Sequence, residues 1–190
     1  AVARQSLVGI DPYLLRDSER AELRLAMAEL LFVDEQFGAA AEVFARALEE
    51  TSERQARTRV LDWWASSLDR HAQLASDAER QRRYAQLLSG LAAESVETGV
   101  VLYWRAAAYR GLEDLDRAWA VAIAAWIQAP LHATGGAVVT LRTDVDRLMR
   151  EAIIPERARH APPPADPAAV RVALSAEWDA IKARWSIMAK

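Results

Sequence analysis

Small and apolar side chains recur at intervals of three and four residues between Val100 and Pro130. Such intervals place the side chains on one face of an α-helix. The segment from Gly111 to Asp114 interrupts the pattern, so the stretch predicts two antiparallel helices joined by a tight turn. Alanine at the facing positions would let the two backbones approach closely. The positions are Leu102, Ala106 and Tyr109 before the turn, and Leu115, Ala118, Ala122 and Ala125 after it.

The same periodicity predicts further helices on both sides of this pair. Antiparallel hairpins are expected over residues 18–50, 53–94 and 99–130, and an extra helix over residues 138–155. Pro155 is expected to perturb or end that extra helix, because proline lacks the backbone N–H that a helix interior requires.

The middle hairpin is the least regular of the three. Ser52 and Ser76 are each followed three residues later by Gln or Glu, the pattern of a capping box that marks a helix start. Ala65 would be equivalent to Ala28 and Ala106, at spacings of 37 and 41 residues (65 − 28 and 106 − 65). The second helix of this hairpin lacks the small residues that the other two hairpins share.

The first and third hairpins resemble the tetratricopeptide repeat, a helical hairpin of about 34 residues. The first departs from the family pattern at Arg24 and Ser52, and the third at Arg105 and Ala122. The resemblance implies an all-α protein, in which residues 1–160 form a short right-handed α-solenoid of about three hairpins. The matching residues are Ala28, Leu31, Phe37, Ala40, Phe44 and Ala47, and then Ala106, Tyr109, Ala118, Ala125 and Pro130, which closes the third hairpin.

In that family the first helices of the repeats line a concave groove that commonly holds a peptide. The resemblance therefore implies a non-catalytic scaffold or adaptor that binds a peptide or a partner protein. Arginines in such a groove can bind carboxylates through paired hydrogen bonds, and aromatic rings can hold apolar side chains. The alternative is that arginines and acids on these helices pair with one another. The matching groove positions are Glu29, Phe32, Arg59, Asp62, Ser66, Arg70, Tyr103 and Arg110.

Trp63 and Trp64 are adjacent, so on a helix their side chains point about 100° apart. Trp64 continues a stripe of apolar residues and is expected in the core. Trp63 is expected either to pack between repeats or to offer an exposed aromatic ring to a ligand.

The C-terminal part of the chain predicts a separate helix. Residues 161–165 form a proline-rich spacer, and Asp166 followed by Pro167 predicts the start of a helix over residues 166–190. This helix is expected to cap the open end of the helical stack. The alternative is that it joins copies into a homo-oligomer or a larger assembly. The apolar stripe that would do either includes Trp178, Ile181 and Trp185.

Composition narrows the choice of partner. The net charge of −3 gives no basic field for nucleic acid, and the chain has no cysteine for disulfides or thiol catalysis. The uncharged run from Ala118 to Leu141 is broken by polar residues, proline and glycine, so a membrane span is not expected. A soluble protein is expected, either cytoplasmic or exported if Ala1 follows a removed signal peptide.

The sequence contains no recognisable catalytic or metal-binding motif. His71, His132 and His160 lie on separate segments without ligands at metal-binding spacing. Asp144 and Asp146 are two residues apart, so on a helix they point away from each other and cannot share a proton. No catalytic residue, metal or cofactor is therefore expected, and a helical enzyme with an unrecognised site is the third hypothesis.

Overall fold

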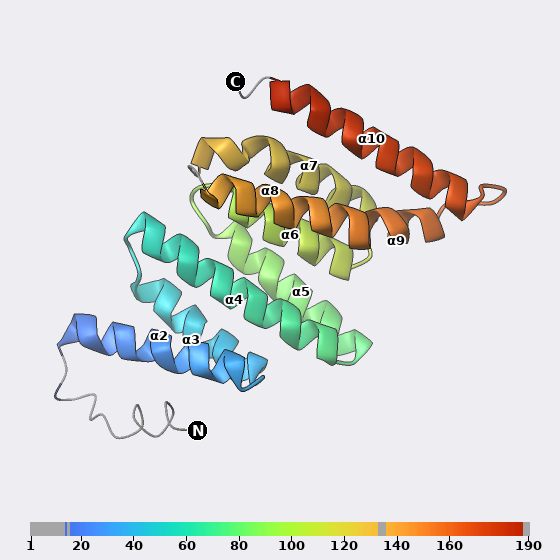
Figure 1. The fold of residues 1–190 in the computed structure, drawn as a ribbon. Coiled ribbons are helices and arrows are strands. Elements are labelled where there is room, and N and C mark those ends of the chain that lie inside the picture. The colour runs from blue at the N-terminus through green and yellow to red at the C-terminus, as the bar shows by residue number, and fades with distance from the viewer. Residues whose placement is uncertain (1–13, 15, 133–135, 188–190) are drawn as a thin grey trace. The chain divides into compact units, whose positions relative to one another are not determined.

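The computed structural model describes residues 14, 16–132 and 136–187. Every regular element in these residues is helical, which confirms the predicted all-α class (Figure 1). Residues 1–13 of the predicted repeat domain and residues 188–190 of the predicted last helix lie outside the described part. The elements are α2 (Asp17–Val33), α3 (Phe37–Glu50), α4 (Arg54–Leu74), α5 (Asp77–Ala92), α6 (Gly99–Gly111), α7 (Leu115–His132), α8 (Gly136–Leu148), the π-helical turn η2 (Met149–Ile153), α9 (Ile154–Arg159) and α10 (Pro167–Ile187).

The chain divides into two compact units, Ala1–Arg83 (unit 1) and Tyr84–Lys190 (unit 2). The boundary falls inside α5. The predicted hairpins 18–50 and 99–130 therefore each lie within one unit, whereas residues 53–94 contribute to both.

In unit 1, α3 packs against both α2 and α4. Its buried residues recur at helical spacing, and Ala40 and Phe44 are completely buried. Helix α4 contributes a matching stripe that includes Leu61, Trp64 and Leu68, so the expectation that Trp64 lies in the core is confirmed. Burial of these apolar side chains drives the helices together.

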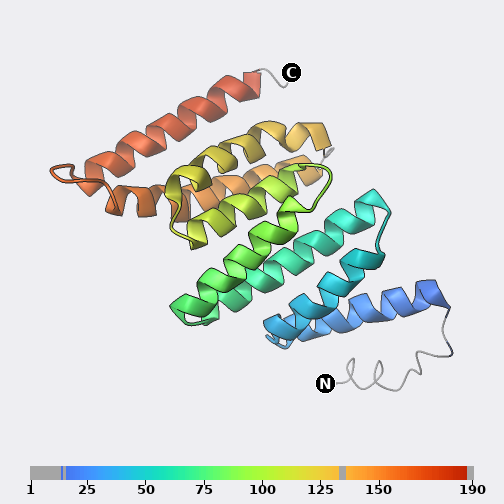
Figure 2. The same cartoon turned by 180° about the vertical axis from the view of Figure 1, so that it is seen from behind.

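In unit 2, α6 packs along α7 through alanines, and Figure 2 shows the pair from behind. Ala106, Ala118, Ala122 and Ala125 have no exposed surface, because the two backbones approach closely at these positions. Helix α8 and η2 pack against α7, and α10 packs against α9 and α7. The larger side chains of this core are Leu102, Trp119, Leu141, Val145, Met149, Ile153, Ile154 and Trp178.

The turns after α2 and α6 have the same geometry. Glu35 and Glu113 both adopt the left-handed helical region, with φ of 60° and 63°. In each turn this residue donates its N–H to a carbonyl three residues before it in the helix end, and the next residue donates to a carbonyl five residues back. These bonds, Glu35 N to Phe32 O with Gln36 N to Leu31 O, and Glu113 N to Arg110 O with Asp114 N to Tyr109 O, form the Schellman motif that ends a helix.

Pro130 and Pro155 both lie within continuous helical segments. Pro130 was expected to close its hairpin, but α7 continues to His132. A proline at this position leaves the carbonyl of Trp126 without its usual helical donor, and Arg142 Nε donates to that oxygen at 3.3 Å. Pro155 does not end its helix, because the preceding turn widens into η2, where Ile154 N–H bonds to Met149 O.

Arginine and glutamate side chains form hydrogen bonds with unpaired backbone groups at helix ends. The start of α4 agrees with the capping-box prediction, but the capping side chain is Glu53 rather than Ser52: Glu53 accepts from the N–H groups of Gln55 and Ala56. At the end of α3, Arg57 donates to the carbonyls of Leu48 and Thr51 at 2.5 and 3.1 Å. These contacts satisfy backbone groups that the helices leave unpaired.

The left-handed conformation of Glu113 predicts that glycine is preferred there. The left-handed region costs a residue with a side chain about 1–2 kcal/mol, and glycine recovers part of this despite its larger unfolded entropy. We expect Glu113→Gly to raise the free energy of unfolding by roughly 0.5–1 kcal/mol, measured by chemical denaturation. The control is Glu177→Gly at an exposed position within α10, which should lower it by about 1 kcal/mol. Equal destabilisation by both changes would contradict the turn assignment.

Two glycines of unit 2 should respond to alanine in opposite directions. A Cβ on Gly111 would lie 2.1 Å from the ring of Tyr84, which is itself buried, whereas a Cβ on Gly136 would meet none of the described residues within 4 Å. We expect Gly111→Ala to lower the free energy of unfolding by about 1–3 kcal/mol and Gly136→Ala to raise it by up to about 1 kcal/mol. Denaturation midpoints measure both; a stabilising Gly111→Ala would show that Tyr84 does not pack on α6.

Candidate functional site

Helices α2 and α4 of unit 1 lie side by side and carry most of the predicted groove residues. Arg59 of α4 donates to Glu29 of α2 at 3.0 Å. Close by, the rings of Phe32 and Trp63 meet edge to face, with centroids 5.1 Å apart. These two contacts join the helices on one surface, which we name the α2–α4 face. Its residues are Glu29, Phe32, Arg59, Asp62, Ser66 and Arg70.

The four α4 residues of this face form a stripe along the helix. Arg59, Asp62, Ser66 and Arg70 follow one another at intervals of three and four, so they share one side of α4. Arg59, Asp62 and Arg70 are exposed, and Ser66 is half-buried. Buried residues such as Leu61 occupy the other side, so packing against α3 fixes the direction in which this polar stripe points.

Phe32 and Trp63 belong to an aromatic cluster that fills unit 1. Trp63 stacks on Phe44 at 5.9 Å with the ring planes 12° apart, and Phe32 also meets Phe37 edge to face. Trp63 therefore packs within unit 1, and it is half-buried rather than presented as an exposed ring. Because Phe32 is also half-buried, only part of its ring remains available at the surface.

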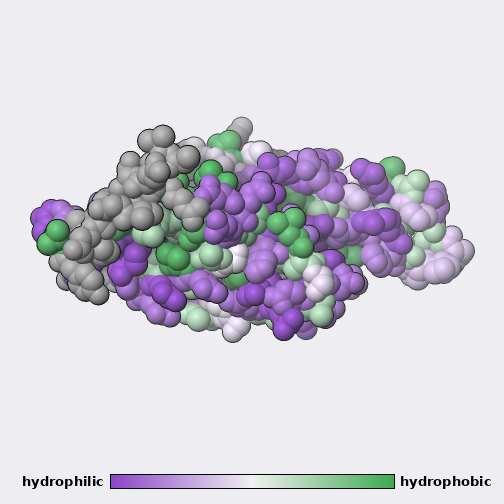
Figure 3. Space-filling model, turned by 90° about the horizontal axis from the view of Figure 1, so that it is seen from below, coloured by the Kyte–Doolittle hydropathy of each residue, from purple (hydrophilic) through white to green (hydrophobic). Residues whose placement is uncertain are grey.

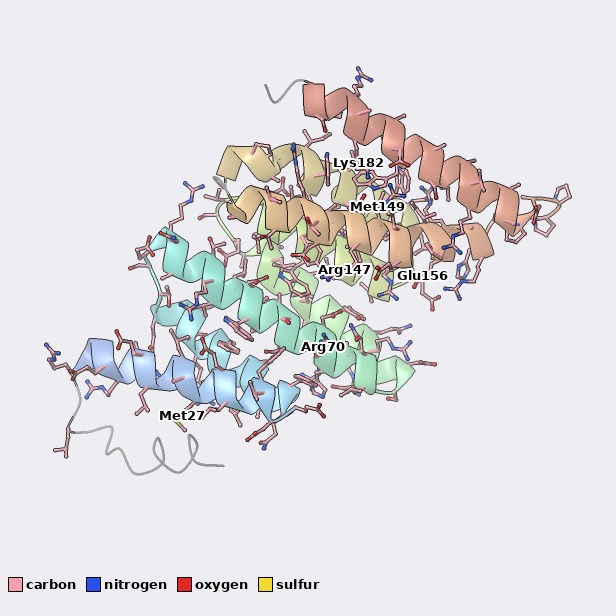
Figure 4. The ribbon with its side chains drawn as sticks, in the orientation of Figure 1. Met27, Arg70, Arg147, Met149, Glu156 and Lys182 are labelled. Atoms are coloured by element: carbon pink, nitrogen blue, oxygen red, sulfur yellow. The ribbon has the colours of Figure 1, made fainter. Side chains whose placement is uncertain are left out.

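The arginines of the α2–α4 face are exposed and are not held in strong ion pairs. The side chain of Arg59 is 73% exposed, and an ion pair in such a position contributes little to stability. A carboxylate from a partner could therefore replace Glu29 at Arg59 at small cost. Arg70 is exposed and forms no ion pair within the part of the chain that the structure describes. Figure 4 labels Arg70 on α4.

Large apolar residues are scattered over the described surface of unit 1. On the face shown in Figure 3, hydrophobic side chains lie in small groups between polar ones. Single exposed apolar residues of this kind are ordinary on a protein surface and do not define a site. The exposed large apolar residues of unit 1 are Leu14, Met27, Val33 and Leu74.

The other two predicted groove residues lie in unit 2, so the eight are not confined to one unit. Tyr103 is half-buried and meets Trp104 edge to face at 5.0 Å. Arg110 binds Glu156 of α9 through two nitrogens, with Nε and one terminal nitrogen 2.9 and 2.7 Å from Oε1. The carboxylate that Arg110 was expected to take from a partner is thus supplied by its own chain.

The predicted assembly helix, α10, is docked on unit 2 through a cluster that we name the Asp146 clasp: Asp146, Arg150, Trp178 and Lys182. Trp178 has no exposed surface, and its indole N–H donates to Asp146 at 2.8 Å. Lys182 Nζ donates to the same carboxylate oxygen, Oδ1, at 2.6 Å. Arg150 Nε donates to the other oxygen of Asp146, Oδ2, at 3.1 Å. Figure 4 shows Lys182 between α10 and the helix that carries Met149.

Aromatic contacts complete the docking of α10. Trp178 meets Trp126 of α7 edge to face at 5.4 Å, and Lys182 lies 5.7 and 5.6 Å from the ring centres of Trp126 and Trp178. Ile181 packs against the same core, and Trp185 is half-buried. The stripe predicted from the sequence therefore faces unit 2. The sequence pairs Asp146 only with Asp144 and does not predict this cluster, since no local pattern connects Asp146 to a lysine 36 residues away.

The clasp keeps Asp146 ionised. Burial opposes ionisation, but the hydrogen bonds from Lys182 and Trp178 and the charges of Lys182 and Arg150 outweigh it, so the pKa of the Asp146 carboxyl lies below its ordinary value. Lys182 and Arg150 likewise hold the pKa of Asp179 below its ordinary value.

The described residues offer no arrangement for a metal ion, since no three His, Asp or Glu side chains converge among them. Within the same residues, no helix combines the length and apolar character that crossing a bilayer requires.

Removing the charge of Asp146 should weaken the clasp in a pH-dependent way. A lowered folded-state pKa contributes stability that is fully present above the unfolded value and is lost as the pH falls through the folded value. We expect Asp146→Asn to lower the free energy of unfolding at pH 7 by roughly 1–2 kcal/mol, and the difference from wild type to shrink below about pH 4.

The matched control for this change is Asp144→Asn. Asp144 pairs with the exposed Arg147 on the same helix, so we expect an effect of at most about 0.5 kcal/mol. Chemical denaturation at several pH values measures both variants. An Asp146→Asn effect that is independent of pH would show that the charge does not contribute.

No protein-family model, known protein or solved structure matches this chain. The α2–α4 face and the Asp146 clasp are therefore defined by the geometry of this chain alone, and the tetratricopeptide resemblance rests on its own residues.

Proposed function

We propose that this protein is a non-catalytic scaffold of tetratricopeptide type, which binds an extended, acidic peptide of a partner protein on the α2–α4 face. The observation that carries the proposal is the equivalence of the hairpins α2–α3 and α6–α7. Their small core residues and their left-handed turn residues are all 78 residues apart (106 − 28, 118 − 40 and 113 − 35). These pairs are Ala28 with Ala106, Ala40 with Ala118, and Glu35 with Glu113.

Burial supports this equivalence. Ala28, Ala40, Ala106 and Ala118 are all completely buried, so the same positions serve helix contact in both hairpins. A shared offset in core residues, turn conformation and turn hydrogen bonds is what duplication of one structural unit produces. Ala65 of α4 is also completely buried, near the middle of the interval.

The turn after α4 limits how far the equivalence extends. There Ala75 is extended, with φ of −91°, and its N–H bonds to Ala72 three residues back. The left-handed residue of the other two turns has no counterpart at this position. We propose that residues 53–94 derive from the same unit and have diverged.

The α2–α4 face suits an acidic peptide because its two arginines are exposed and stand on one side of α4. Arg59 and Arg70 are 11 residues apart (70 − 59), about 16 Å along a helix at 1.5 Å per residue. An extended peptide covers that length with about five residues. Guanidinium groups at this spacing would bind two carboxylates of the peptide, with Ser66 between them as a hydrogen-bonding group.

Charge reversal at Arg70 tests the proposal. Peptides selected from a displayed library on the immobilised full chain should be rich in Asp and Glu, and Arg70→Glu should weaken their binding about tenfold or more, measured by isothermal titration calorimetry. Arg46→Glu makes the same charge change at an exposed position on α3 and should leave binding unchanged.

Two outcomes would contradict the proposal. Equal loss of binding in the Arg70→Glu and Arg46→Glu variants would indicate a general charge effect and not a site. Selection of no peptide by the wild-type chain would argue against a peptide-binding scaffold. Arg110→Glu is not a suitable probe, because it would place a second carboxylate against Glu156 and disturb unit 2.

The alternative, an assembly joined through α10, has to account for the complete burial of Trp178 within unit 2. A helix docked in this way can join two copies only if it leaves its own groove.

A further inference from the structure

Helix α10 docks on unit 2 through one half of its length. From Leu174 to Trp185 the helix presents the stripe that contains Trp178, whereas Ala168, Ala169 and Val172 in its first half are exposed. Val172 is 71% exposed. The docking thus resembles a helical ligand lying in a groove, with Trp178 as the central anchor and Lys182 as the charged one.

The groove under α10 is specific for that helix. Trp178 inserts beside Trp126, and its N–H reaches Asp146, which also receives Lys182. A second charge pair joins Arg150 to Asp179 of α10. A helix that fits this groove must therefore present an indole with a lysine four residues later, together with a carboxylate between them, as α10 does (178, 182 and 179).

The docking of α10 is also incomplete. The indole N–H of Trp126 is buried and has no hydrogen-bond partner among the residues that the structure describes. Burying such a donor without a partner opposes docking. The ion pair of Arg150 with Asp179 is partly exposed, so it adds little. Release of α10 is therefore less costly than the burial of Trp178 alone would suggest.

The connection between α9 and α10 would let α10 leave its groove as an intact helix instead of unwinding from its end. Pro162, Pro163 and Pro164 separate α9 from α10, and the loop is closed by a bond from Ala165 N–H to Pro162 O at 3.1 Å. Consecutive prolines cannot extend either helix and favour an extended chain. Opening this one turn would carry α10 away from its own unit while leaving the helix itself intact, because Asp166 caps its first turn by accepting from Ala168 and Ala169.

We propose that α10 exchanges between two copies of this chain, so that the groove formed by α7, α8, η2 and α9 is an interaction surface for the α10 of a second copy. The contacts in the groove are identical whether α10 comes from the same chain or from another one. The two arrangements therefore differ only in the conformation of the proline hinge and in protein concentration. This inference does not depend on peptide binding at the α2–α4 face.

A pair of charge reversals tests the exchange. In Asp146→Lys the groove, where the new lysine lies beside Arg150, repels Lys182 of its own α10, and in Lys182→Asp the helix repels Asp146 of its own groove. Each variant alone should be monomeric. Unfolded together and refolded as a mixture, the two should form a one-to-one heterodimer with twice the monomer mass, because both exchanged interfaces then join opposite charges. Native mass spectrometry distinguishes the two copies by their masses.

The double variant Asp146→Lys/Lys182→Asp is the control. It restores opposite charges within one chain, so it should refold without needing a second variant. A mixture of the single variants that remains monomeric, while circular dichroism shows both to be folded, would overturn the proposal; the groove would then serve its own α10 or a foreign helix.

A hinge variant keeps the test decisive if the charge variants fold poorly. Deleting Pro163 and Pro164 from the otherwise unchanged chain should prevent α10 from folding back on its own unit. Light scattering should then give twice the monomer mass, and Trp178→Ala in the same chain should return it to the monomer mass. A hinge-deleted chain that is monomeric would overturn the proposal.

Discussion

The close approach of helix backbones at alanine is the constraint on which the rest of this structure depends. Ala106, Ala118 and Ala122 have no exposed surface, so α6 and α7 meet with almost no side-chain volume between them. The core must then be completed by large side chains at the edges of the contact. Trp119 and Trp178 supply that volume, and the second of them comes from α10. The alanine contact thus explains why a C-terminal helix is needed to complete unit 2.

Periodicity predicted the helices because the three- and four-residue spacing of apolar side chains, which gives a helix one face to bury, can be seen in the local sequence. The helices α2, α3, α6 and α7 begin and end close to the predicted hairpin boundaries. The turn residues were less predictable: glutamate at positions 35 and 113 has no compositional signal for a left-handed conformation, which is usually provided by glycine. Pro130 was assigned a stronger effect than it has, since an arginine from another helix accommodates it, whereas Pro155 perturbs its helix through a π-turn, which is one of the two outcomes expected for it. These are tertiary and backbone responses that a local pattern does not encode.

In the candidate site too, the residues set by local spacing could be predicted, and the contacts between distant parts of the chain could not. The stripe from Arg59 to Arg70 could be predicted because its spacing places it on one side of α4, opposite a buried stripe. The pairing of Arg110 with Glu156 could not, because the two residues are 46 positions apart and meet only when α9 packs beside α6. The role of Asp146 in holding α10 was missed for the same reason. Its partners Trp178 and Lys182 come from a helix that the proline spacer separates from it.

Arginine composition alone therefore says little about binding in this chain, since packing decides what each arginine does. Arg57 and Arg142 are partly buried and donate to unpaired backbone carbonyls, Arg57 at the end of α3 and Arg142 at the carbonyl of Trp126 that Pro130 leaves without a donor. A guanidinium used in this way cannot also bind a ligand without exposing those carbonyls. Arg59 and Arg70 differ because α4 directs them away from α3, so no helix end competes for them. On the proposed binding surface, Arg59 and Arg70 remain accessible because the packing of α4 against α3 directs them outward, so the burial that fixes the fold also fixes where these two cations point.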